Sequence, residues 1–181
     1  LLHSLVHRHH VALAARAAIV SRPGALSPVL CNGFEGGVFH QLREIGHAVI
    51  NGQRVGDFIL APGITDYRKR VQYQSYDVTG LLKDGENILS VQLADGWYRG
   101  STGAWGLRNQ YGTETKLLAQ LEITHTDGHV QTVCTDESWE WSNDGPIRFA
   151  DNKDGEVVDA GCAPSYNGKA KATAHPVTPS A

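Results

Sequence analysis

Two turns in the last third of the chain carry the oxygen chemistry that a hard cation prefers. One is Asn143-Asp144-Gly145, and the other runs from Asp151 to Glu156. Calcium takes carboxylate, amide and backbone oxygens, often from one Asp- and Asn-rich turn. We therefore consider Asp151, Asn152 and Asp154 as calcium ligands, with Asp151 and Asn152 also able to hold vicinal sugar hydroxyls. The competing interpretation is that these side chains hydrogen-bond their own turn backbones, and no EF-hand spacing is present.

Two tryptophans are candidates for sugar contact. Trp97 follows an Asp-Gly pair, and Trp105 lies in a Gly-Ala-Trp-Gly stretch typical of a loop. Aromatic rings fit the apolar face of a pyranose, and loops carry function on rigid scaffolds. The alternatives are core or interdomain packing for Trp97, and packing against a neighbouring domain for Trp105. Trp139 and Trp141 are two residues apart, so they share one face of a strand, which favours a core position.

Paired carboxylates invite a glycosidase interpretation. Asp154 with Glu156, or Asp136 with Glu137, could supply an acid and a base. Such pairs are common in surface turns, however, and nothing else in these segments suggests catalysis. No P-loop, nucleophile elbow or zinc motif occurs in the sequence.

Basic and histidine-rich segments do not form a convincing site. His7, His9 and His10 resemble a metal-binding tract, but a disordered basic end explains them better. The run from Arg68 to Arg70 favours a solvated loop or a guarded strand edge over phosphate binding. The formal net charge is −3, which gives no basic field for nucleic acid.

Segments of alternating apolar and polar residues must position these groups. The alternation is clear over residues 71–76, 89–93 and 117–124, where a period of two places one set of side chains on a core face. Asn51-Gly52 and Asp127-Gly128 predict hairpin turns between flanking strands. About seven or eight short strands without helical patterning predict an all-β fold, an antiparallel β-sandwich or jelly roll.

Composition divides the chain into three zones. Residues 1–39 are rich in Ala, Arg and His without clear periodicity, and predict an irregular or partly helical extension; Ala12–Ile19 has helical propensity. One hypothesis is that residues 1–39 are not native sequence. Residues 40–160 form the predicted β-sandwich. Residues 161–181, with three prolines, predict a linker or edge segment toward a following domain.

Cysteine content and hydropathy add little. The three cysteines are odd in number and have no CxxC spacing, so no disulfide framework is predicted. No apolar run reaches the roughly 18 residues that a membrane-spanning helix requires, and no membrane partner is expected. Residues 11–20 imitate a signal peptide, but Arg16 interrupts them. We expect a soluble module, and the sequence does not distinguish a cytoplasmic protein from one secreted with its parent enzyme.

Six blocks in order resemble the N-terminal domain of bacterial-type α-L-rhamnosidases. The resemblance covers residues 44–160 and departs from the family pattern at Ile64 and Gly161. The blocks are Asn51–Asp57 with Leu60–Gly63, Thr65–Tyr73, Tyr76–Thr79, Gly85–Asn87 with Asp95–Gly100, Gly145–Ile147 and Asp154–Ala160.

This resemblance implies a non-catalytic module upstream of an (α/α)-barrel that holds the catalytic carboxylates. Enzymes of the family remove terminal L-rhamnose by an inverting mechanism. Because the resemblance places the catalytic carboxylates in the barrel, this chain alone is expected to be inactive. Its expected partners are the catalytic domain and L-rhamnose or a rhamnosylated glycoside. One alternative, since some relatives bind L-rhamnose through calcium, is an autonomous lectin-like domain. Another is a truncated fragment with no separate role.

Overall fold

The protein is an antiparallel β-sandwich, and the predicted all-β class is confirmed. The computed structural model describes residues 29–31, 34–42, 46–59, 63–113, 117–136, 139–142, 145–162 and 168–169. The first strands are β1 (Val29–Cys31), β2 (Phe34–Leu42), β3 (Gly46–Ile50), β4 (Gln53–Arg54), β5 (Tyr73–Asp77), β6 (Gly85–Asn87) and β7 (Leu89–Leu93). The later strands are β8 (Leu118–His125), β9 (Val130–Cys134), β10 (Glu140–Trp141), β11 (Ile147–Asp151), β12 (Gly155–Val158) and β13 (Gly168–Lys169). Two short helical turns, η1 (Thr79–Leu81) and α2 (Gly96–Arg99), interrupt them.

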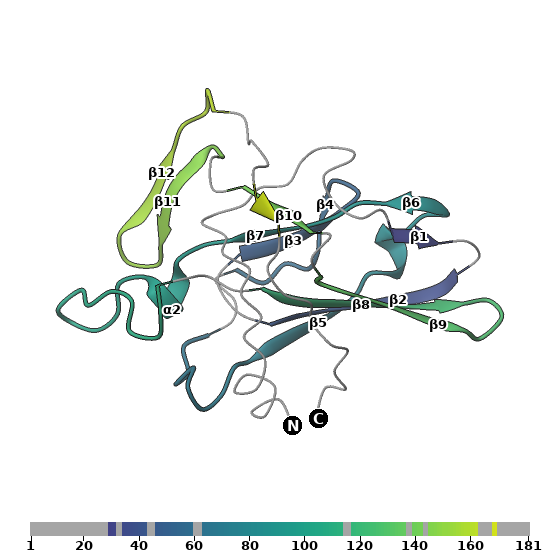
Figure 1. Ribbon diagram of the computed structural model, residues 1–181, viewed down its shortest axis with the longest axis horizontal. Coiled ribbons are helices and arrows are strands. Elements are labelled where there is room, and N and C mark those ends of the chain that lie inside the picture. Colours follow the sequence, from purple (N-terminus) through teal and green to yellow (C-terminus); the bar gives the residue numbers. More distant parts are fainter. Residues whose placement is uncertain are drawn as a thin grey trace.

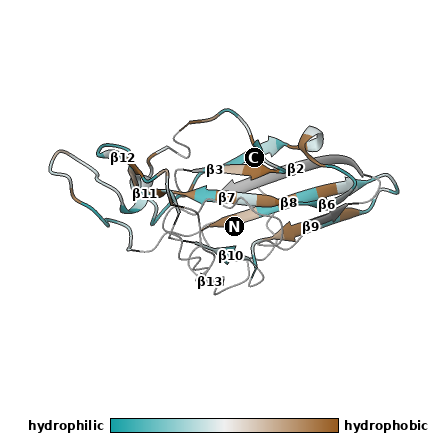
Figure 2. Ribbon diagram, turned by 90° about the horizontal axis from the view of Figure 1, so that it is seen from above, coloured by the Kyte–Doolittle hydropathy of each residue, from teal (hydrophilic) through white to brown (hydrophobic). Residues whose placement is uncertain are grey.

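Two sheets form the layers of the sandwich. A sheet in the order β5-β2-β8-β9 lies under a sheet in the order β4-β3-β7, and all of their pairings are antiparallel (Figure 1). Apolar and polar residues alternate along β7 and β8 (Figure 2). Their apolar residues meet those of β3 between the layers. This core contains Ala48, Ile50, Leu89, Val91, Leu93, Ala119, Leu121, Ile123 and Trp139.

The Asn51-Gly52 hairpin forms as predicted. Ile50 pairs with Gln53 across it, and Asn51 and Gly52 adopt φ values of 51° and 81°. The turn is also tied to the opposite loop, because the Asn51 amide donates to Asn87 Oδ1 at 2.8 Å and to Leu81 O at 2.9 Å. Asn87 itself is only 1% exposed. A hydrogen bond between the half-buried Asn51 and the buried Asn87 therefore ties the hairpin to the opposite loop.

The N-terminal boundary of the sandwich differs from the prediction. Residues 29–39 were expected in an irregular extension, but they contain β1 and most of β2. Strand β2 is an inner strand, since it pairs with β5 on one side and β8 on the other. The two-residue strand β13 pairs with β10, which puts part of the expected edge segment on a sheet. The predicted helix at 12–19 and the histidines of the first ten residues lie outside the described residues.

One end of the molecule carries the segments that the sequence singled out. The β11–β12 hairpin forms a separate two-stranded sheet beside α2, and a long segment extends beyond α2 at the same end (Figure 1). The β8–β9 hairpin lies at the opposite end of the longest axis. The backbone amide of Asp95 donates to Ala150 O at 3.2 Å, which joins the exit of β7 to β11. The two chemistry-bearing segments, around Asp95 and Asp151, are therefore neighbours.

Candidate functional site

A loop that we call the Trp105 loop, residues 101–112, leaves α2 and folds back on it. Thr102 and Leu107 form an isolated bridge, in which both the amide and the hydroxyl of Thr102 donate to Leu107 O. Asn109 N donates to Arg99 O at 3.0 Å, which returns the chain to the helix. The stem of the loop is therefore held by backbone bonds, and its tip is the Gly-Ala-Trp-Gly stretch.

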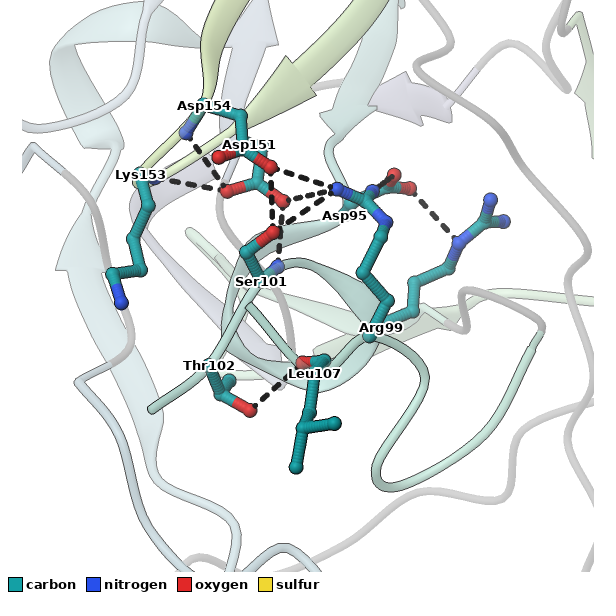
Figure 3. Close-up of polar contacts among 9 residues, drawn as sticks. Asp95, Arg99, Ser101, Thr102, Leu107, Asp151, Lys153 and Asp154 are labelled. Atoms are coloured by element: carbon teal, nitrogen blue, oxygen red, sulfur yellow. Dashed lines mark hydrogen bonds and ion pairs between the residues drawn. The ribbon is translucent and has the colours of Figure 1, made fainter. Parts of the chain in front are cut away.

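Five residues, Asp95, Ser101, Arg108, Asp151 and Asp154, form a cluster that we call the Arg108 clasp. The three aspartates converge from the exit of β7 and the β11–β12 turn (Figure 3). The Arg108 guanidinium donates to Asp95 at 2.8 Å, to Asp151 at 2.9 Å and to Asp154 at 3.2 Å. Its carbon lies 5.2 Å from the centre of the Phe149 ring. One cation thus joins the Trp105 loop to two other segments through charge-assisted bonds.

Asp151 is the buried centre of the clasp. Its side chain is 0% exposed, and its carboxylate accepts hydrogen bonds from the amides of Ser101 at 2.7 Å, Lys153 at 2.9 Å and Asp154 at 3.2 Å. Burial is the largest influence on the pKa of Asp151 and acts to raise it, but the three amide donors and the Arg108 charge together lower that pKa below its ordinary value. The carboxylate is therefore held in its charged form.

Further contacts stiffen the same region. Ser101 Oγ donates to Asp154 at 2.5 Å, and Lys153 Nζ donates to Gly103 O near the loop tip. Arg99 Nε lies 2.9 Å from Asp95 Oδ1. The two groups form an ion pair, although Arg99 Nε does not meet the geometry of a hydrogen-bond donor. The β11–β12 turn and the Trp105 loop are consequently bonded at both the stem and the tip.

Three tyrosines support the other side of the loop. Tyr67 and Tyr98 are 2% and 6% exposed, and their rings meet edge to face with centres 5.8 Å apart. Tyr111, at the end of the Trp105 loop, lies 5.0 Å from Tyr67 in the same manner. Gly112 leaves room for this packing, since a Cβ there would lie 2.6 Å from the Tyr98 hydroxyl. Aromatic contacts therefore hold the end of the loop, as ionic contacts hold its middle.

The carboxylates that were considered as calcium ligands are already paired with an arginine. Asp151 and Asp154 do come together, but with Arg108, whose charge would repel a cation at that position. The three carboxylates of the clasp surround a guanidinium, and over the parts of the chain that the structure describes, no group of three or more His, Cys, Asp or Glu side chains could hold a metal ion. Asn152 Nδ2 is buried and has no hydrogen-bond partner. This donor set does not fit calcium unless Arg108 leaves, and calcium binding stays a prediction; Asn143 and Asp144 lie outside the described residues.

The two candidate tryptophans occupy different environments. Trp105 is 88% exposed at the loop tip, between Gly103 and Gly106 with φ values of 68° and 60°. Trp97 is half-buried in α2. Sugar contact by either ring remains a prediction. Of the other pair, Trp139 is a core residue, 7% exposed, and Trp141 is half-buried.

Sequence reasoning missed the central residue of the site. Arg108 was not singled out, because its partners Asp95 and Asp151 lie 13 and 43 residues away. Ser101 was missed for the same reason. The only local signal was the Gly-rich stretch before Arg108, which marks a loop but says nothing about what anchors it. Of the glycosidase pair Asp154 and Glu156, the Asp154 carboxylate is bonded to Ser101 and Arg108.

The fold and this geometry define a β-sandwich module that presents a rigid loop. Its sequence and structure have known relatives. A family model described as the alpha-L-rhamnosidase N-terminal domain matches residues 45–178. The chain belongs to this family, as the sequence blocks predicted. Among the described residues, no helix is long and apolar enough to cross a membrane.

Similar proteins are much longer than this chain. An alpha-L-rhamnosidase of Streptomyces avermitilis is 49% identical over 113 residues, which are 62% of this chain and 11% of that protein. One from Formosa agariphila is 41% identical over 61% of this chain and 12% of its own length. The chain therefore spans about an eighth or less of these relatives.

Solved structures agree with the family assignment. The crystal structure of the Streptomyces avermitilis alpha-L-rhamnosidase complexed with L-rhamnose superposes with a TM-score of 0.70 at 38% identity, over 77% of this chain and 14% of that one. Native Aspergillus terreus alpha-L-rhamnosidase gives a TM-score of 0.70 at 30% identity, over 94% of this chain and 22% of that one.

Replacing Arg108 should loosen the module. Arg108→Met keeps an apolar stem on Phe149 but leaves three carboxylates without their common cation. We expect the free energy of unfolding to fall by about 1–3 kcal/mol, less than for a fully buried pair because the guanidinium is 33% exposed. Urea denaturation measures this. The matched control is Lys69→Met, which removes an 82% exposed side chain that lies 3.9 Å from Asp66 and should cost at most about 0.5 kcal/mol. Equal losses in both variants would contradict the central role of the clasp.

Acid should weaken the module through Asp151. Because the folded-state pKa of Asp151 is lowered, its contribution to stability is complete above the ordinary carboxyl pKa of about 3.9 and disappears as pH falls through the folded value. Wild type should therefore lose stability more steeply than Asp151→Asn between about pH 5 and pH 3. Thermal denaturation across this range checks the slope, with Asp57→Asn as an exposed control. Parallel curves for wild type and Asp151→Asn would be the contrary result.

Proposed function

We propose that this chain is a non-catalytic accessory module of an α-L-rhamnosidase, which packs beside the catalytic domain and helps to orient it. The proposal rests on the family assignment and on the small share of the related enzymes that this chain spans. The domain family matches most of this chain, whereas the chain corresponds to only 11–12% of the related enzymes. Most of such an enzyme, including the (α/α)-barrel that the resemblance implies, lies outside this region.

The geometry of the acidic residues supports a structural role. Inverting glycosidases hold an acid and a base roughly 6.5–9.5 Å apart with room for water between them. Here Asp95, Asp151 and Asp154 converge on one guanidinium, so their charges are neutralised rather than directed at a substrate. A pKa held low, as for Asp151, is also the opposite of what a general acid needs.

An activity assay tests this proposal. The purified chain should release no p-nitrophenol from the α-L-rhamnoside above the buffer rate, because both catalytic carboxylates belong to another domain. The Streptomyces avermitilis enzyme serves as the positive control for the assay. Circular dichroism of the same sample establishes that the chain is folded. The accessory role would be refuted if the isolated chain hydrolysed the rhamnoside and if Arg108→Met or Asp151→Asn abolished that hydrolysis.

A second candidate function is calcium-dependent binding of L-rhamnose. Two observations favour it: the solved Streptomyces avermitilis relative was complexed with L-rhamnose, and Trp105 offers an exposed ring. The residues concerned would be Trp97, Trp105, Asp151 and Asn152, with Asp151, Asn152 and Asp154 as metal ligands. Arg108 stands against it, because calcium would have to displace a guanidinium bonded to three carboxylates.

Calorimetry separates the two functions. We expect L-rhamnose to give the same trace in calcium and in EDTA, since Arg108 already neutralises the acidic cluster. A monosaccharide offers few atoms, so the titration must reach millimolar sugar. Heat that appears only with calcium and is lost in Asp151→Asn would select the binding function instead.

A further inference from the structure

The most exposed large apolar side chain among the described residues is Trp105. It is 88% exposed, and Leu107, two residues on, is 58% exposed. Tryptophan is the side chain most enriched at the energetic centres of protein interfaces. Both residues belong to the Trp105 loop, and the segment that follows α2 extends beyond it at one end of the molecule (Figure 1). The loop tip therefore projects an apolar ring and an apolar neighbour into solvent.

The loop that carries this ring is already ordered. Arg108 bonds three aspartates, Thr102 bonds Leu107, and Lys153 bonds Gly103 next to the tip. Association costs free energy for each flexible segment that has to be immobilised. These bonds exist before any partner arrives. Association through Trp105 would therefore lose less conformational entropy than association through a flexible loop.

Several polar groups of the Trp105 loop are hydrogen-bonded within the module. The Ser101 hydroxyl donates to Asp154, the Thr102 hydroxyl donates to Leu107 O, and the Arg108 guanidinium is shared among carboxylates. Sugar sites combine an aromatic ring with polar groups that converge on the ligand. Here Ser101, Thr102 and Arg108 are already bonded within the module, and Leu107, two residues from Trp105, is apolar. This chemistry matches an apolar pocket on a protein better than a sugar.

We propose that the Trp105 loop docks, ring first, into an apolar pocket on another domain of the parent α-L-rhamnosidase polypeptide. The inference rests on the proposed accessory function and names the surface through which that function is exerted. The choice of occupant comes from length: the matched region is 14% of the solved Streptomyces avermitilis chain, so most of that protein lies beyond the module. A second copy of this chain and a sugar are the competing occupants.

Hydroxyl-radical footprinting of Trp105 tests the docking. The oxidation rate of Trp105 is compared between the isolated chain and the full-length parent enzyme. We expect roughly tenfold protection in the full-length enzyme, because an interface core excludes water from its central aromatic residue. The internal control is Val130, which is 51% exposed and begins β9 at the opposite end of the molecule. Its rate should be unchanged.

A paired substitution gives a second readout. Trp105→Ala and Val130→Ala are introduced into the full-length enzyme, and both remove an exposed side chain, so folding of the module itself should be unaffected. Trp105→Ala should separate the unfolding transition of the module from that of the catalytic domain in calorimetry, and Val130→Ala should not. Equal behaviour of the two variants would overturn the docking proposal.

The remaining outcomes distinguish the occupants. Protection of Trp105 in the isolated chain by L-rhamnose would make the loop a sugar platform, and protection that rises with chain concentration would make it a self-association surface; either overturns the proposal. Equal Trp105 oxidation in both proteins also overturns it. The accessory function itself fails only in the separate hydrolysis assay, so the two failures cannot be confused.

Discussion

The arrangement of the functional end of this molecule depends on the interaction of one guanidinium with three carboxylates. Arg108 takes Asp95 from the exit of β7, and Asp151 and Asp154 from the β11–β12 turn. No backbone ladder joins the Trp105 loop to β11 or β12 among the described residues, so these ionic bonds, with the hydrogen bonds of Ser101 and Lys153, supply the connection. Asp151 is fully buried and accepts three amide donors besides, which makes it the fixed point of the group.

The sandwich and the loop are held by different forces. Alternating apolar residues of β3, β7 and β8 form the core. Hydrophobic contacts of this kind are non-directional and tolerate many side chains. The loop depends on directional, charge-assisted bonds that need particular residues at particular places. The core and the loop therefore depend on different kinds of contact, as is common where loops are placed on a sandwich scaffold.

Much of the scaffold could be predicted, and most of the clasp could not. Local signals were sufficient for the Asn51-Gly52 hairpin and for the core faces of β7 and β8, because turn conformation and strand period are local properties. Strand β2 escaped prediction because its Gly-containing sequence has little alternation, and its position depends on pairing with β5 and β8. The Asp-rich turn at residues 151–154 was considered as a calcium site or as a self-bonded turn; Asp151 does bond its own turn, and the cation beside it is a side chain 43 residues away. An acidic turn does not reveal whether a metal or an arginine neutralises it.

The exposure of Trp105 has a thermodynamic consequence. A side chain that is 88% exposed in the folded chain gains almost nothing from folding, since it is also exposed in the unfolded chain. The exposed ring of Trp105 thus adds almost nothing to the stability of the loop. Apolar burial of Trp105 and Leu107 becomes available only when a partner covers them, and it is then added to a loop whose conformational entropy is already reduced. Under the docking proposal, the ionic contacts of Arg108 would fix the position of the loop, and burial of the apolar tip would supply the free energy of association.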